Sequence, residues 1–299
     1  MTDNVLIIQS ASKYRGKIQV LTDIDLSVAP GERVALLGHN GAGKSTLMKM
    51  ILGLTPLSGG DITISGAKPG SAAARAGTAF LPESVNFHPT LTGREQLTLF
   101  ARLAGGTQPD INTLLDRVGL ADATNNRIAT YSKGMRQRLG LAQVLLGRPK
   151  VALLDEPTSG LDPISRQDLY AIIDELAAQG TAVLIASHAL TEVEAQTDRI
   201  AILRKGLKVA DDTLANLSRL AKLPTRLRIL VREGQADQIA EATGGARING
   251  ASVELYCDAG HKMQELRRIA AMGDVIADIE MTPPRLEDLY RHYAKEGQT

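Results

Sequence analysis

The pattern of apolar and polar positions divides this chain into two parts whose elements follow one another in a different order. Up to about residue 210, short apolar runs typical of buried strands alternate with stretches whose apolar residues recur at helical spacing. The expected strands are 5–10, 20–28, 33–37, 61–64, 151–154 and 181–186, and the expected helices begin at 44, 93, 111 and 163. Strands that alternate with helices predict an α/β fold with a mostly parallel sheet.

Two smaller groups of elements accompany that sheet. The early strands predict an antiparallel β subdomain, with a short basic loop between 5–10 and 20–28. The helices expected at 93–102 and 111–118 indicate a helical subdomain of about 84–150. Thr92 followed by Glu95 fits a capping box, which marks the start of the first of these helices.

The character of the sequence changes after about residue 210. The expected elements are strands at 226–231, 246–249, 252–256 and 275–280, and helices at 235–243, 261–272 and 286–293. The order β-α-β-β-α-β predicts a small ferredoxin-like α+β domain. We therefore expect a first domain at 1–210 and an accessory or dimerisation domain at 211–299, which holds no catalytic constellation.

Composition and charge narrow the class of protein. The formal net charge is +1, aromatic residues make up 3% and tryptophan is absent, so nothing favours nucleic acid as the main partner. Cys257 is the only cysteine, which excludes an internal disulfide and indicates a reducing compartment. No apolar run approaches the roughly 18 residues that span a bilayer. We expect a cytoplasmic protein, soluble or held to a membrane by another protein.

One glycine-rich stretch carries the strongest chemical signal. Residues 38–46 fit the phosphate-binding pattern G-x-x-x-x-G-K-[ST], between an expected strand and an expected helix. That order places backbone N–H groups around a phosphate at a helix N-terminus. Lys44 is expected to reach the terminal phosphates and Ser45 to ligate Mg²⁺. The expected nucleotide-binding residues of this loop are Gly38, Asn40, Gly41, Gly43, Lys44, Ser45 and Thr46.

An acidic pair ends the apolar strand 151–154. In a nucleotide-binding sheet the ligand lies beyond the carboxyl ends of the strands, so Asp155 is expected to hold Mg²⁺. Glu156 is expected to polarise the water that attacks the γ-phosphate. An acidic strand-to-loop turn is the alternative interpretation of the pair taken alone.

Residues 131–138, with the sequence Tyr-Ser-Lys-Gly-Met-Arg-Gln-Arg, introduce a family resemblance. The stretch resembles a diverged signature motif of ABC-transporter ATPases, with Met135 in place of the usual glutamine. Ser132 can cap the helix that follows, so its hydroxyl and the helix N-terminus can meet a phosphate. Ser132 and Gly134 are the nucleotide-contacting residues that this resemblance implies.

Further positions resemble the same family in the expected order along residues 4–210. Tyr14 matches the aromatic residue that stacks on adenine, and His188 matches the histidine that contacts the γ-phosphate and serves in hydrolysis. Glu83 stands where the family usually has a glutamine that contacts Mg²⁺. Residues 159–162 resemble the loop that crosses the dimer interface.

The resemblance implies a P-loop ABC ATPase with ATP and Mg²⁺ as its ligands. It also implies a head-to-tail homodimer, because the phosphate loop of one copy meets the signature motif of a second copy. A membrane permease is the implied partner, docked on residues 84–100, and the implied location is the cytoplasmic face of the cell membrane.

A narrower resemblance concerns residues 81–87, 91–95, 130–143 and 286–291, which are similar to the NosF-type ATPases of nitrous-oxide reductase maturation. That subfamily implies a NosY-like permease, a periplasmic NosD-like protein and a sulfur or copper cargo. The chain itself has no cysteine pair or clustered histidines, and Met48 and Met50 are expected in the core rather than on copper. The alternatives are a drug or ion exporter ATPase, a non-transport ABC ATPase acting on ribosomes or DNA, and a regulatory ATP sensor.

Overall fold

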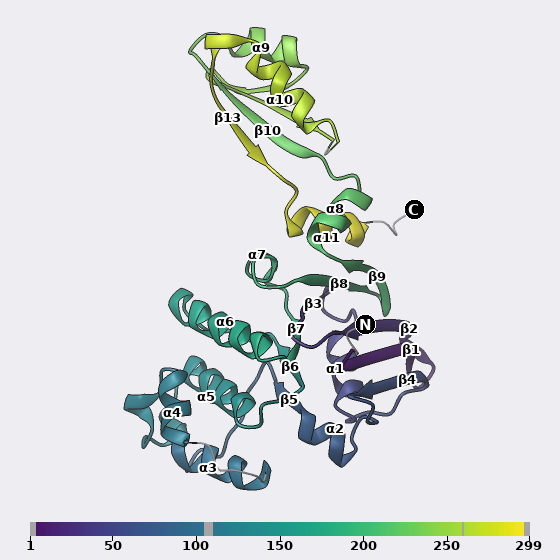
Figure 1. Ribbon diagram of the computed structural model, residues 1–299, viewed down its shortest axis with the longest axis vertical. Helices are drawn as coiled ribbons and strands as arrows, with labels where there is room; N and C mark the ends of the chain where they lie inside the picture. The colour runs from purple at the N-terminus through teal and green to yellow at the C-terminus, as the bar shows by residue number, and fades with distance from the viewer. Residues whose placement is uncertain (1–3, 105–109, 259, 296–299) are drawn as a thin grey trace. The chain divides into compact units, whose positions relative to one another are not determined.

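The computed structural model describes residues 4–104, 110–258 and 260–295 (Figure 1). The chain divides into two compact units, Met1–Asp211 and Asp212–Thr299. The first unit is built on a six-stranded sheet with the order β5-β6-β7-β3-β8-β9. Its strands are β3 (Arg33–Leu37), β5 (Thr78–Leu81), β6 (Val151–Asp155), β7 (Ala182–Ala186), β8 (Arg199–Arg204) and β9 (Leu207–Asp212).

The five strands from β5 to β8 run parallel, as the alternation of strands and helices predicts. Both faces of the sheet are buried along its central strands β3, β6 and β7. Along β6, Ala152 and Leu154 belong to a core shared with the helices, whereas Val151 and Leu153 belong to a second core on the other face. This period of two explains why the strands read as continuous apolar runs.

The second core lies between that sheet and a three-stranded antiparallel sheet of order β2-β1-β4. Its strands are β1 (Leu6–Arg15), β2 (Ile18–Val28) and β4 (Gly59–Ile64). The loop expected between 10 and 20 is wrong, because β1 continues to Arg15 through irregular pairing with β2. The Ser12 hydroxyl donates to Asp23 at 2.9 Å across the two strands, which keeps this polar stretch in the sheet.

The helices of the first unit are α1 (Lys44–Ile51), α2 (Ala72–Gly77), α3 (Gly93–Ala104), α4 (Ile111–Arg117), α5 (Lys133–Leu145), α6 (Pro163–Ala178) and α7 (Leu190–Glu194). Helices lie on both sides of the parallel sheet, with α5 and α6 on one side and α1 and α2 on the other, and α3 and α4 lie beyond α5 (Figure 1). Helices α3, α4 and α5 pack on one another around Leu97, Leu115 and Leu139. The capping box is confirmed, since the backbone N–H of Thr92 donates to Glu95 at 2.8 Å and that of Glu95 donates to Thr92 at 3.2 Å.

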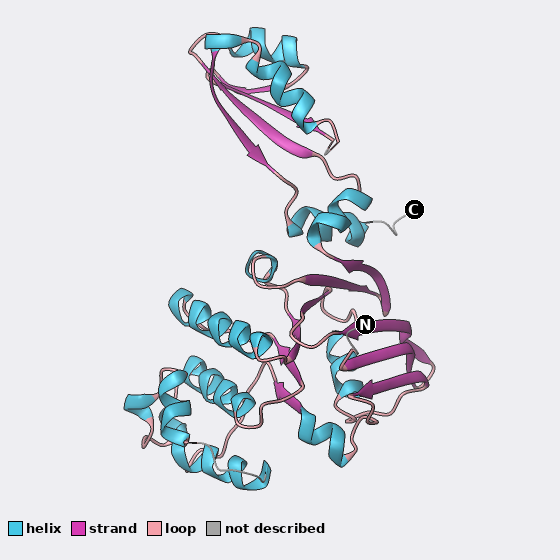
Figure 2. Cartoon of the chain, viewed as in Figure 1, coloured by secondary structure: helices cyan, strands magenta, loops and turns pink. Residues whose placement is uncertain are grey.

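The second unit contains an antiparallel sheet of order β11-β12-β10-β13, seen with its helices in Figure 2. Its elements are α8 (Leu214–Leu220), β10 (Thr225–Val231), α9 (Ala236–Thr243), β11 (Ala246–Asn249), β12 (Ser252–Cys257), α10 (Lys262–Ala270), β13 (Ile276–Thr282) and α11 (Leu286–Lys295). Leu227, Ile229 and Val253 are fully buried between the sheet and helices α9 and α10. The expected order of strands and helices from β10 to α11 is confirmed, whereas helix α8 was not expected.

Candidate functional site

Four segments that carry predicted site residues meet at one edge of the six-stranded sheet. Because β5, β6, β7 and β3 are parallel neighbours, their carboxyl ends share that edge. The glycine-rich loop follows β3, Glu83 follows β5, Asp155 and Glu156 end β6, and His188 follows β7. Residues up to 150 positions apart in the chain are thereby brought to one place.

The glycine-rich loop has the backbone that its sequence predicts. Gly41 and Gly43 have φ values of 85° and 111°, which side chains rarely adopt. A Cβ on Gly43 would lie 2.5 Å from Cδ2 of Leu21, so packing as well as conformation requires glycine there. Helix α1 begins at the next residue, Lys44, and its free N–H groups point into the loop.

Lys44 is buried, with 8% of its surface exposed. Its ammonium donates to the carbonyl oxygen of Gly38 inside the loop. Burial lowers the pKa of Lys44, and the negative charges of Glu156 and Asp155 oppose that shift. A buried amine held among carbonyl oxygens can exchange them for phosphate oxygens, which pair more strongly with it.

Asp155 and Ser45 offer a pair of hard oxygen ligands. The Ser45 hydroxyl lies 3.5 Å from a carboxylate oxygen of Asp155. Burial is the main cause that raises the pKa of Asp155, and the negative charges of Glu156 and Glu83 raise this pKa further. Oxygen donors crowded by negative charge fit Mg²⁺, which commonly takes few protein ligands and fills its shell with water and phosphate.

Glu156 is buried and strained. Its φ is 49°, a left-handed value that costs a non-glycine residue roughly 1–3 kcal/mol. Its backbone N–H donates to the carbonyl of Ala186 at 2.8 Å, and its carboxylate lies 2.8 Å from Nδ1 of His188. The Ser187 hydroxyl adds a contact at 3.4 Å, a neighbour that no sequence pattern had indicated.

Tyr14 and Thr46 lie at the meeting of β1 and α1. Tyr14 is 47% exposed, and its hydroxyl donates to Gln19 at 2.9 Å, so the ring is available at the surface. The guanidinium of Arg15 donates to the Thr46 hydroxyl at 3.3 Å and thereby ties the end of β1 to the phosphate-loop helix. Arg15 belongs to no motif, so sequence reasoning missed it.

Ser132 caps helix α5, as its position predicts. Its hydroxyl accepts from the backbone N–H of Met135 at 3.1 Å. Gly134 packs against the loop after β6, where an added Cβ would lie 3.3 Å from Leu161. Lys133, which the sequence reasoning also passed over, donates to the Ser159 hydroxyl at 2.8 Å. Within residues 4–104 and 110–258, no hydrogen bond joins Ser132 or Gly134 to the phosphate loop of the same chain.

The sequence profile of the ABC transporter family matches residues 21–159. YdbJ of Bacillus subtilis, an uncharacterised ABC transporter ATP-binding protein, is 43% identical over 210 residues, which are 69% of this chain and 68% of that protein. The chain belongs to the ATP-binding subunits of ABC transporters. Such a subunit binds ATP with Mg²⁺ and hydrolyses the ATP to power transport.

Two further relatives align with almost the whole chain, and a solved structure shares the fold of the ATPase domain. The linearmycin resistance ATP-binding protein LnrL of Bacillus subtilis is 35% identical over 94% of this ABC subunit and 96% of its own length. A Nod factor export ATP-binding protein of Rhizobium etli is 31% identical over 93% and 90%. A solved ATP-binding subunit of an ABC transporter superposes with a TM-score of 0.68 at 32% identity, over 72% of this chain and 92% of that chain.

No helix in the described part of the chain has both the length and the apolar character that crossing a bilayer requires. ABC ATPases typically dimerise and work with membrane permeases.

Proposed function

We propose that this chain is the ATPase subunit of an ABC exporter that removes a drug-like compound through a separate permease. The observation that carries the proposal is the alignment with two relatives over more than nine tenths of the chain, one named for antibiotic resistance and one for export. That alignment includes the second unit as well as the ATPase domain. The working location is then the cytoplasmic face of the cell membrane, with residues 84–100 as the docking surface for the permease.

The geometry at the sheet edge supports a role for each of these residues. Lys44 and the loop N–H groups hold the β- and γ-phosphates, and Ser45 and Asp155 hold Mg²⁺. Glu83 adds a negative charge beside Asp155 and would help to hold the metal. Glu156 orients the attacking water, and His188 holds the Glu156 carboxylate and reaches the γ-phosphate.

Within the described residues no hydrogen bond joins Ser132 or Gly134 to the phosphate loop of the same chain, which supports a dimeric site. Two copies packed head to tail place the helix N-terminus at Ser132 against the γ-phosphate bound to the partner. The exposed Tyr14 ring then packs on the adenine. Hydrolysis removes the group that both copies contact, which lowers their affinity and lets them separate.

The second unit fits an accessory or dimerisation domain. Its order of elements and its strand order β11-β12-β10-β13 favour the ferredoxin-like class. We assign residues 1–210 to the nucleotide-binding domain and residues 211–299 to this accessory domain.

Nitrous-oxide reductase maturation is a second candidate, favoured by residues 81–87 and 286–291. It would require a NosY-like permease, a periplasmic NosD-like protein and a sulfur or copper cargo. The relatives named above give it no support.

The decisive experiment replaces Glu156 with glutamine in the chromosomal gene and in the purified complex with its permease. A positioned base contributes about 10²–10⁴-fold, so we expect ATP hydrolysis to fall by that factor while ATP binding persists. Hydrolysis within threefold of the unaltered complex would reject Glu156 as the base. Export predicts hypersensitivity of the mutant cells to some toxic compounds, whereas maturation predicts loss of nitrous-oxide reductase activity instead.

A further inference from the structure

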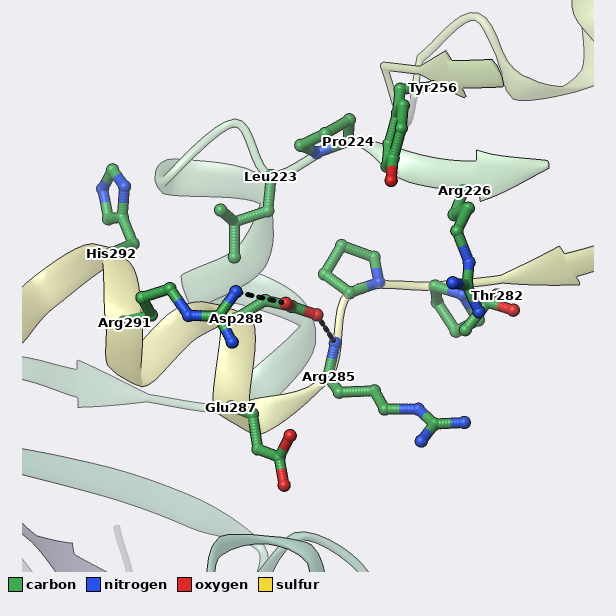
Figure 3. A pocket seen from close by; sticks show the side chains of 12 residues that line it. Leu223, Pro224, Arg226, Tyr256, Thr282, Arg285, Glu287, Asp288, Arg291 and His292 are labelled. Carbon is green, nitrogen blue, oxygen red and sulfur yellow. Dashed lines mark hydrogen bonds and ion pairs between the residues drawn. The ribbon is translucent and has the colours of Figure 1, made fainter. Parts of the chain in front are cut away.

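The second unit contains a cavity of about 480 Å³ whose lining includes none of the proposed ATP-site residues (Figure 3). It lies where two short links, Leu223–Pro224 and Pro283–Pro284, connect the sheet with helices α8 and α11. Its volume falls in the range of about 300–1,000 Å³ that is typical of small-molecule sites.

One part of the cavity wall is apolar and stiff. Leu223, the three prolines of the links and the ring of Tyr256 line it. Tyr256 is 62% exposed, and its hydroxyl donates to Glu254 at 2.8 Å, which fixes the ring beside the cavity. Prolines and a tethered tyrosine lose little conformational freedom when a flat ring packs against them.

The other part of the wall is cationic. Arg226, Arg285 and Arg291 reach it from three segments. Among the described residues, two of these arginines have loose ion pairs alone, at 3.6 Å for Arg226 and Glu254 and at 3.9 Å for Arg291 and Asp288.

The acceptors of those pairs are already shared. Glu254 also accepts from Tyr256, and Asp288 accepts from the backbone N–H of Arg285 at 3.1 Å. The guanidinium of Arg285 makes no hydrogen bond or ion pair with any residue that the structure describes. Each guanidinium has five N–H donors, so donors outnumber acceptors around the cavity.

We propose that this cavity binds an aromatic monocarboxylic acid, with the carboxylate on Arg285 and the ring on Tyr256 and the link prolines. The planar, forked guanidinium suits a carboxylate. Glu287 and Asp288 stand on the same rim, and their negative charges disfavour a multiply charged anion such as a phosphate ester. The bound acid bridges β12 and the link that precedes α11, so it stabilises the second unit.

The test is a calorimetric titration of the full chain with 2-naphthoate. Saturating Mg²⁺ and ADP are present, so that the nucleotide site is occupied and cannot bind the acid. The variant Arg285→Gln removes the charged partner of the carboxylate, and the variant Tyr256→Leu removes the ring that packs on the ligand. Arg232→Gln is the matched control, because Arg232 is an exposed arginine of the same unit outside the cavity. Circular dichroism confirms that each variant is folded, and 2-naphthalenemethanol serves as the uncharged probe.

We expect saturable 2-naphthoate binding that weakens about tenfold in Arg285→Gln, and similarly in Tyr256→Leu, since a charge-assisted pair and ring packing each contribute on that order. The control variant keeps full affinity, and the uncharged alcohol binds about tenfold more weakly than the acid. No saturable binding up to millimolar acid, or unchanged affinity in either cavity variant, would overturn the proposal. ATP hydrolysis is measured separately, so a failure here is distinct from a failure of the exporter assignment.

Discussion

Ser132 combines two roles that one substitution can separate. Its hydroxyl caps helix α5, and the proposed dimer places the same hydroxyl against a γ-phosphate bound to the partner. Aspartate at this position keeps the cap, because aspartate is as good an N-cap residue as serine and its charge favours the helix N-terminus. In the proposed dimer the same charge would face the phosphate bound to the partner. Ser132→Asp therefore preserves the fold while it opposes the closed dimer.

The effect of these substitutions on the unfolding free energy and their effect on dimer affinity are both large enough to be measured separately. Ser132→Ala loses the cap bond to the N–H of Met135 and costs about 1 kcal/mol of unfolding free energy, whereas Ser132→Asp stays within about 0.5 kcal/mol of the unaltered chain. Two like unit charges about 4 Å apart repel by about 1–4 kcal/mol at effective dielectric constants between bulk water and a protein surface. The head-to-tail dimer contains this contact twice, so ATP-driven dimerisation of Ser132→Asp should weaken by about 2–8 kcal/mol, which is at least about thirtyfold.

Urea unfolding gives the stability, and sedimentation velocity with Mg²⁺ and ATP gives the dimer affinity, both in the Glu156→Gln background so that ATP persists. Ser132→Thr is the matched control, because threonine retains both the cap and a neutral hydroxyl. Full dimerisation by Ser132→Asp would refute the reasoning, since it would show that no phosphate lies near this residue.

Three further predictions concern the stability of the first unit. Burial and two neighbouring carboxylates raise the pKa of Asp155, so its ionised form is disfavoured in the folded chain without metal. Asp155→Asn should raise the unfolding midpoint without nucleotide and abolish Mg²⁺-dependent hydrolysis; a lower midpoint in calorimetry would contradict this. Tyr131→Phe removes a buried bond of 2.7 Å to the carbonyl of Ala123, which still accepts from a second N–H, so urea unfolding should show a loss of about 1 kcal/mol and not the 3 kcal/mol of an orphaned group. Arg33 holds the pKa of Asp198 below its ordinary value, so the stabilisation is complete above about pH 4 and disappears as the pH falls through the lowered value. The stability difference between the unaltered chain and Asp198→Asn should shrink in acid, and an equal difference at about pH 3 and about pH 7 would argue against this pair.

The fold could be predicted wherever the apolar pattern is strong. Strands β3, β6 and β7 are continuous apolar runs, and each of them was expected within one residue or two. Helix α2 and strand β5 were not expected. Each is so short that its apolar residues do not repeat often enough to show a helical or a strand period. Strands β8 and β9 carry polar residues at their ends and were missed for that reason.

The candidate site was predictable in its motifs and not in its contacts. The glycine-rich loop and the acidic residues at strand ends follow fixed local sequence patterns, so Lys44 and Asp155 could be predicted as site residues from the sequence alone. The contact of Glu156 with His188 joins residues 32 positions apart and depends on the order of the parallel strands. The cavity of the second unit draws on segments between 223 and 292, so no linear pattern could have indicated it.

The central claim is that two copies of this chain hold ATP between them. The most direct measurement is a crystal structure of Glu156→Gln with Mg²⁺ and ATP. We expect a head-to-tail dimer in which the triphosphate lies about 3 Å from the ammonium of Lys44 and from the hydroxyl of the partner's Ser132. A triphosphate that contacts Lys44 and meets no residue of a second copy would contradict it.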